Sequence, residues 1–141
     1  MYNKILVAID VFREKNAEKL CKTANDMAKM NGAAVRLVSV VPDYGMPLVA
    51  TYFPKDAQDK VKSEMSAMLK KYATEYIDDN VSAILRQGKR ARNIVDEATE
   101  WGADLVIIGC RKKASRDNIR MLGACSSSVA DRVDCSVIVV R

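Results

Sequence analysis

The sequence predicts a single α/β domain built around a five-stranded parallel sheet. Its 141 residues suit one domain of ordinary size. Short apolar runs recur along the chain, and between them apolar residues return every three or four positions, which is the spacing of an amphipathic helix. The runs are nearly continuous rather than alternating, as expected for strands that are buried on both faces of a parallel sheet. Alternation of such strands with helices indicates the α/β class.

Five segments have the composition of strands. The first, KILVAID, and the fourth, DLVIIG, are almost wholly apolar. The third, VSAIL, is shorter and more polar, and we expect it at an edge of the sheet. The five expected strands are Lys4–Asp10, Ala34–Val41, Val81–Leu85, Asp104–Gly109 and Val137–Val140.

Four segments between the strands have helical spacing. In the first, apolar residues follow one another at steps of three and four from Ala17 to Ala28, and the pattern stops at Asn31 and Gly32. Glycine is the usual residue just past the end of a helix, because it adopts the left-handed conformation without strain. Asp43–Pro54, which holds one glycine and two prolines, is expected to be a loop that returns over the sheet. The other expected helices cover residues 57–76, 91–98 and 122–129.

Composition excludes several classes of protein. Lys and Arg number 23 against 18 Asp and Glu, a net charge of +5, which suits a phosphate-bearing ligand but is too dilute to indicate nucleic acid. No apolar run approaches the roughly 18 residues of a membrane-spanning helix, and no leader precedes the first strand. We therefore expect a cytoplasmic protein that binds neither nucleic acid nor membrane.

The chain has four cysteines and no histidine. Histidine-dependent catalysis and Cys/His zinc sites are thereby excluded, and we expect neither catalytic nor metal-binding residues. The cysteines stand in apolar patterns without CxxC spacing, which predicts reduced thiols in the core. Cys110, beside Arg111 and Lys112, is the cysteine whose neighbours could lower a thiol pKa.

The segment after the fourth strand has the chemistry of a phosphate-binding loop. Gly109–Gly123 reads GCRKKASRDNIRMLG and leads into a helical pattern. Glycine-rich loops and helix N-termini present backbone amides to anions. A solvent-exposed loop whose glycines serve only a turn has the same pattern, and the spacing leaves both readings open. Asp10 ends the first strand and would face the same crevice if the first and fourth strands are neighbours. The positively charged residues of the loop are Arg111, Lys112, Lys113, Arg116 and Arg120.

Other motifs do not fit. A phosphoryl-accepting Asp10 would need a neighbouring acid to hold Mg²⁺, but Val11 and Phe12 follow it. The P-loop pattern GxxxxGK[S/T] is absent. The run Ser126–Ser128 has neither a histidine nor a Gly-x-Ser-x-Gly elbow for nucleophilic chemistry, and we expect these serines to satisfy backbone amides at the start of a helix.

Four segments resemble the universal stress protein family: ILVAID, ADLVIIG, the glycine loop, and the closing LGACSSSVADRVDCSVIVVR. The resemblance covers essentially the whole chain, 1–141, as one domain. It implies a Rossmann-like open sheet in the order 3-2-1-4-5 with helices on both faces. It also implies a homodimer through the last strand, Val137–Val140, and ATP held by the pattern G-x2-G-x9-G-[S/T] after the fourth strand.

This chain keeps part of that ATP pattern. By the resemblance, Gly109 is the first glycine, whereas Lys112 stands at the second. Gly123 corresponds to the third glycine, one residue later than the pattern requires. Ala124 stands at the hydroxyl position. The basic residues of the loop could replace lost backbone contacts with charge-assisted hydrogen bonds.

The resemblance extends to the adenine side of the site. Asp10 corresponds to an acid beside the adenine, Val40 to an apolar residue that packs on its ring, and Ser126 to a small residue near the phosphates. Any Mg²⁺ would accompany the phosphates. The expected binding residues are Ala8, Asp10, Val40, Gly109, Arg111, Lys112, Gly123, Ala124, Cys125 and Ser126.

Three functions follow as expectations. The first is a regulatory protein of the stress response that binds ATP or another adenine nucleotide as a homodimer and is not an enzyme. The second is a dimeric interaction module whose degenerate site holds no nucleotide. The third is slow ATP hydrolysis, for which Asp10 is the candidate general base.

Overall fold

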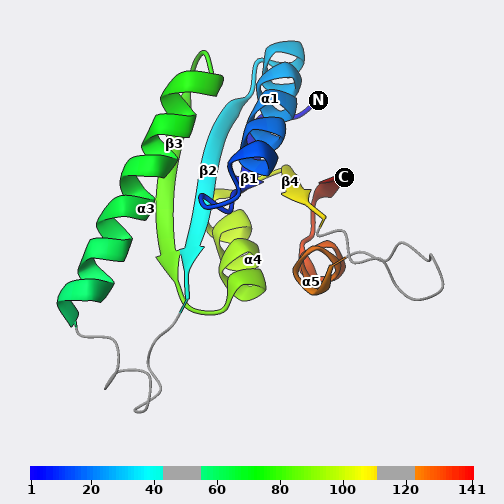
Figure 1. Cartoon of the computed structure of the whole chain (residues 1–141). Helices are drawn as coiled ribbons and strands as arrows, with labels where there is room; N and C mark the ends of the chain where they lie inside the picture. The colour runs from blue at the N-terminus through cyan, green and yellow to red at the C-terminus, as the bar shows by residue number, and fades with distance from the viewer. Residues whose placement is uncertain (43–54, 111–122) are drawn as a thin grey trace.

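The chain folds into alternating strands and helices (Figure 1). The computed structural model describes residues 1–42, 55–110 and 123–141. The expected loop Asp43–Pro54 and the basic residues between positions 111 and 120 lie outside these ranges. The elements are β1 (Lys4–Ala8), α1 (Glu14–Asn31), β2 (Ala34–Val41), α3 (Lys55–Tyr76), β3 (Val81–Gln87), α4 (Arg90–Trp101), β4 (Leu105–Gly109), α5 (Ala124–Arg132) and β5 (Ser136–Val140).

The five strands form one sheet in the order β3-β2-β1-β4-β5, with every neighbouring pair parallel. The fold class and the strand order implied by the family resemblance are therefore confirmed, as is the edge position of the third strand. β1 lies at the centre, where Ala8 pairs with Val38 of β2 on one side and with Ile108 of β4 on the other. This register brings the carboxyl ends of β1, β2 and β4 to the same edge of the sheet.

Helices cover both faces of the sheet (Figure 1). Ile5, Val7 and Ile9 point to the face that α1 and α3 cover, whereas Leu6 and Ala8 point to the face of α4 and α5. Alternate side chains of a strand point to opposite faces, so a strand covered on both sides must be apolar throughout. This explains the continuous apolar run of β1. No helix in the described ranges is both long and apolar enough to cross a membrane.

The end of the first helix matches the prediction, whereas the end of the first strand does not. The first helix ends as expected, because Gly32 adopts a left-handed conformation (φ 64°) and its amide bonds to the Ala28 carbonyl. The first strand, however, ends at Ala8 and not at Asp10. The Ile9 amide still bonds to the Val38 carbonyl at 2.8 Å, but the chain then turns, and the Arg13 amide bonds to the Asp10 carbonyl at 3.1 Å. The apolar residues after Ala8 belong to a buried turn, which periodicity does not distinguish from a strand.

All four cysteines are free thiols. Cys21 and Cys110 are buried, as predicted. Cys125 and Cys135 are half-buried and pack against the core beneath α4 and α5. Burial raises the pKa of the Cys21 thiol to about 12, so this side chain stays neutral at physiological pH.

A buried carboxylate ties the edge strand β3 to the sheet and to α4. Glu97 of α4 is 2 % exposed, and its two carboxylate oxygens each lie 2.8 Å from an arginine, Arg36 of β2 and Arg86 of β3. Arg86 also contacts Glu100 at 3.0 Å, and the Arg36 guanidinium lies 4.6 Å from the centre of the Trp101 ring. The two arginines therefore share one buried partner, and its loss would remove an ion pair from each of them.

We expect Glu97→Ala to lower the free energy of unfolding by about 3 kcal/mol, because it removes one side of a buried charge network. Glu100→Ala is the matched control: the Glu100 side chain is 66 % exposed, and exposed ion pairs contribute at most about 1 kcal/mol. Urea denaturation at pH 7 measures both changes. Equal losses in the two variants would contradict the role given to Glu97.

Candidate functional site

The winding of the sheet reverses between β1 and β4. The chain leaves β1 for α1 on one face and leaves β4 for α5 on the other, although the two strands are paired neighbours. In open parallel sheets, ligands bind at the carboxyl edge where the connections diverge in this way. The expected neighbourhood of the first and fourth strands is confirmed, and it places Asp10 and Gly109 just beyond the paired residues Ala8 and Ile108.

The carboxylate of Asp10 stabilises the turn after β1 by accepting a hydrogen bond. One carboxylate oxygen of Asp10 accepts a hydrogen bond from the Phe12 amide at 3.1 Å, and the Asp10 carbonyl accepts one from the Arg13 amide at 3.1 Å. Aspartate commonly stabilises turns in this way. Val11 is wholly buried, whereas Phe12 is 62 % exposed at the rim. The half-buried Asp10 side chain is therefore presented by a hydrogen-bonded turn.

Gly109 at the end of β4 allows a close approach by α1. A Cβ atom built on Gly109 would lie 2.7 Å from Nδ2 of Asn16, which belongs to the first turn of α1. Glycine provides the space for that contact. Asn16 was not among the predicted site residues. A polar residue early in an amphipathic helix looks like part of its solvent face, so the sequence contains no signal for this contact.

A side-chain hydrogen bond links the start of α5 to the end of β4. Ser126 is buried, and its hydroxyl donates a hydrogen bond of 2.7 Å to the Gly109 carbonyl. The prediction that Ser126 satisfies an amide at the helix start is therefore wrong. Gly123, the residue before α5, makes no side-chain cap hydrogen bond, and its carbonyl accepts the first helical hydrogen bond, from the Ser127 amide. The serine acts as a donor to the neighbouring strand because α5 packs directly against the end of β4.

The structure brings most of the predicted binding residues to one edge. Ala8, Asp10 and Gly109 come from the ends of β1 and β4, and Ser126 joins α5 to this group. The Ala8 side chain is buried in the core, so this residue can offer a ligand only its backbone. Val40 lies near the end of β2, two residues past Val38, the partner of Ala8. Gly123, Ala124 and Cys125 form the start of α5, whereas Arg111 and Lys112 lie outside the described residues.

Positive charge gathers next to this edge. A hollow of about 560 Å³ lies between the first turns of α1 and the ends of β4 and β5. Among the described residues that line it, four side chains are cationic and one, that of Glu14, is acidic. The electrostatic potential at the edge therefore favours anionic groups on a ligand. The residues that line the hollow are Arg13, Glu14, Lys15, Asn16, Lys19, Cys110 and Arg141.

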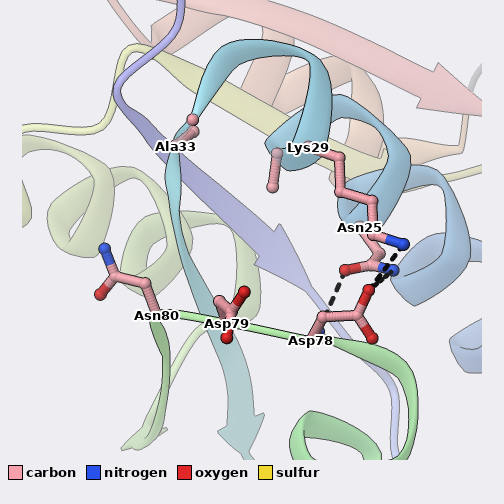
Figure 2. A pocket seen from close by; sticks show the side chains of 8 residues that line it. Asn25, Lys29, Ala33, Asp78, Asp79 and Asn80 are labelled. Carbon is pink, nitrogen blue, oxygen red and sulfur yellow. Dashed lines mark hydrogen bonds and ion pairs between the residues drawn. The ribbon is translucent and has the colours of Figure 1, made fainter.

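A second hollow, of about 360 Å³, lies at the opposite end of the strands, where β2 and β3 begin. It lies between the end of α1 and the turn before β3 (Figure 2). There Asp78 lies 2.6 Å from the Lys29 ammonium, and its backbone amide donates to the Asn25 side chain at 3.1 Å. The hydrogen bond from Lys29, followed by one from Asn25, holds the pKa of Asp78 below its usual value. These contacts link the turn before β3 to the end of α1.

Comparison with known proteins agrees with this architecture. The model of the universal stress protein family matches residues 1–141. Universal stress protein YxiE of Bacillus subtilis is 28% identical over 151 residues, and the alignment covers 100% of both chains.

Solved structures share the fold. A universal stress protein from Archaeoglobus fulgidus superposes with a TM-score of 0.72 at 24% identity and is covered completely, as is this chain. A structure described as the universal stress protein from Archaeoglobus fulgidus in complex with dAMP has a TM-score of 0.65 at 21% identity over 99% of this chain and 98% of that one. Since the family match spans every residue, the chain belongs to the universal stress protein family.

Proposed function

We propose that this protein binds an adenine nucleotide at the carboxyl ends of β1, β2 and β4 and acts as a regulator in the stress response. The observation that carries the proposal is the placement of the Asp10 turn beside Gly109 at the switch point of the sheet. The dAMP complex of a protein with the same fold supports the choice of an adenine nucleotide. We place the protein in the cytoplasm.

The adenine would lie between Asp10 and Val40. A carboxylate accepts a hydrogen bond from the exocyclic amine of adenine, whereas guanine presents a carbonyl oxygen at the equivalent position. Val40 lies two residues past Val38, the partner of Ala8, and Asp10 lies in the turn two residues past Ala8, so both residues lie at the carboxyl end of the sheet. The half-buried Val40 side chain would supply an apolar wall for the ring. These two residues would thus select adenine over guanine.

The phosphates would extend from Gly109 towards the start of α5. The uncapped helix that begins after Gly123 suits an anion through its backbone amides and dipole. In this proposal Ala124, Cys125 and Ser126 line the phosphate end, while Arg111 and Lys112 add charge from the loop between. The positive side chains at the N-terminal end of α1 favour a ligand with several phosphates, such as ATP, with Mg²⁺ bound to the phosphates.

Regulation by binding fits this site better than catalysis. The carboxylate of Asp10, the acid of the predicted set, accepts the Phe12 amide and so helps to build the turn. A general base must lie within hydrogen-bond reach of the water that it activates at the phosphates, whereas in this proposal Asp10 lies at the adenine, the other end of the nucleotide. We therefore propose that nucleotide binding changes how the protein interacts and that hydrolysis is not its function.

The proposed assembly is a homodimer through β5. This strand pairs with β4 along one side and forms the edge of the sheet. Its four valine and isoleucine residues are half-buried in the single chain. An apolar edge strand invites pairing with another strand, and a two-fold axis would pair it with its own copy.

A nucleotide-free dimeric interaction module is the alternative function. Ala124 at the start of α5 offers no hydroxyl to a phosphate, and Lys112 replaces a glycine of the family pattern. If the unsubstituted protein fails to bind ATP at low salt and Lys112→Gly restores binding, the lysine blocks the site and this alternative is correct.

For the nucleotide site, we expect Asp10→Ala to weaken ATP binding by about tenfold, because the adenine amine loses its acceptor. The preference for ATP over GTP should shrink at the same time. Calorimetric titration measures both affinities, with Asp26→Ala, an exposed acid of α1, as the control that leaves them unchanged. Equal affinity of the unsubstituted protein for ATP and GTP would count against the adenine pocket.

For the assembly, Val139→Lys should convert the dimer to a monomer, because it places a charge in the paired edge. Val81→Lys is the matched control, since Val81 is also half-buried on an edge strand, β3, at the other side of the sheet. Light scattering measures the mass at tens of micromolar (roughly the range in which weak contacts persist), and circular dichroism checks that both variants fold. An unsubstituted protein that is already monomeric refutes the proposed dimer.

A further inference from the structure

The helix α3, which supplies none of the predicted binding residues, contacts the turn after β1. Tyr72 of α3 is 5 % exposed, and its hydroxyl donates a hydrogen bond of 3.1 Å to the carbonyl oxygen of Val11. Val11 lies directly after Asp10 and is wholly buried. The bond therefore joins the far end of α3 to the turn that carries the proposed adenine acceptor, across 61 positions of sequence.

Hydrogen bonds that end on Asp10 stabilise the turn after β1. Two of them come from the Phe12 amide and from the Arg13 amide. The Val11 carbonyl and the Phe12 amide belong to the same peptide plane. The hydrogen bond from the Phe12 amide to the Asp10 carboxylate restrains this plane at its N–H, and the Tyr72 hydroxyl restrains it at its carbonyl. The orientation of this one peptide unit thus links Tyr72 to Asp10.

Tyr72 is well suited to hold that plane. Its ring stacks on that of Tyr76, with centroids 6.2 Å apart and an angle of 24° between the planes. Burial, followed by the charge of Glu14, raises the pKa of Tyr72, so the hydroxyl keeps its proton throughout the physiological range. A buried carbonyl that loses its donor costs free energy, so the hydrogen bond from Tyr72 stabilises this orientation of the peptide plane.

We propose that Tyr72 is a positioning residue for the nucleobase: it fixes the Val11–Phe12 peptide, which in turn aims the Asp10 carboxylate at the exocyclic amine of adenine. The inference rests on the proposed function and adds a determinant of base selectivity outside the binding edge. Through this bond, a displacement of α3 would change the affinity of the site for adenine.

The test uses Tyr72→Phe, which removes only the hydroxyl. We expect ATP affinity to fall by about three- to tenfold, the usual range for one buried hydrogen bond, while GTP affinity changes less. Tyr76→Phe is the control: it lies on the same helix and in the same ring pair, and no hydrogen bond of its hydroxyl is found within the described residues. In an Asp10→Ala background, Tyr72→Phe should cause no further loss of ATP affinity, because the two residues act on one contact.

A purely structural role for Tyr72 gives a different result: ATP and GTP affinities fall together, and the loss persists in the Asp10→Ala background. That outcome overturns the inference, as does an unchanged ATP/GTP ratio in Tyr72→Phe. If the unsubstituted protein binds no adenine nucleotide, the proposed function fails and the role of Tyr72 in binding fails with it.

Amide hydrogen exchange provides a readout without ligand. In Tyr72→Phe the amides of Phe12 and Arg13 should exchange faster than in the unsubstituted protein, while the central-strand amide of Ile107 keeps its rate. Unchanged exchange at Phe12 would show that the hydroxyl does not hold the turn, and would overturn the inference whatever the nucleotide affinities are.

Discussion

The structure depends on the central position of β1 between β2 and β4. A strand paired on both sides and covered on both faces has room for apolar residues alone, so Ile5 to Ile9 are all buried. The connections of β1 and β4 leave for opposite faces, and they diverge at the carboxyl ends of these strands, beside Asp10 and Gly109. The same pairing that builds the core therefore creates the switch point at which ligands bind in open parallel sheets.

Three helices contact that end of the sheet, one by close packing and two by hydrogen bonds from a side-chain hydroxyl to a backbone carbonyl. Asn16 of α1 packs against the glycine of β4, Ser126 of α5 donates to the Gly109 carbonyl, and Tyr72 of α3 donates to the Val11 carbonyl. At the opposite end of the strands, the ion pair of Lys29 with Asp78 links α1 to the turn before β3. A site whose backbone is held from several sides needs little reorganisation on binding, which favours affinity.

Much of the fold could be predicted from the sequence, because strands buried on both faces and amphipathic helices leave clear periodic signals. The order of the strands came from the family resemblance and not from the periodicity. The end of β1 was placed two residues late, because the buried Val11 continues the apolar run into a turn. The contacts of Asn16, Tyr72 and Ser126 could not be predicted, since each depends on where a distant element packs. The role of Lys112 in phosphate binding stays a prediction, because this residue lies outside the described residues.

We infer that adenine nucleotides bind at the carboxyl ends of β1, β2 and β4. Titration of the ¹⁵N-labelled protein with ATP, followed by amide chemical shifts, is the sharpest test of this site. The amides of Asp10, Phe12 and Gly109 should shift and saturate together, and those of Asn25 and Asp78 at the opposite end of the strands should not shift. Saturable shifts confined to the Asn25–Asp78 end, or no saturable shift at low salt, would contradict this inference.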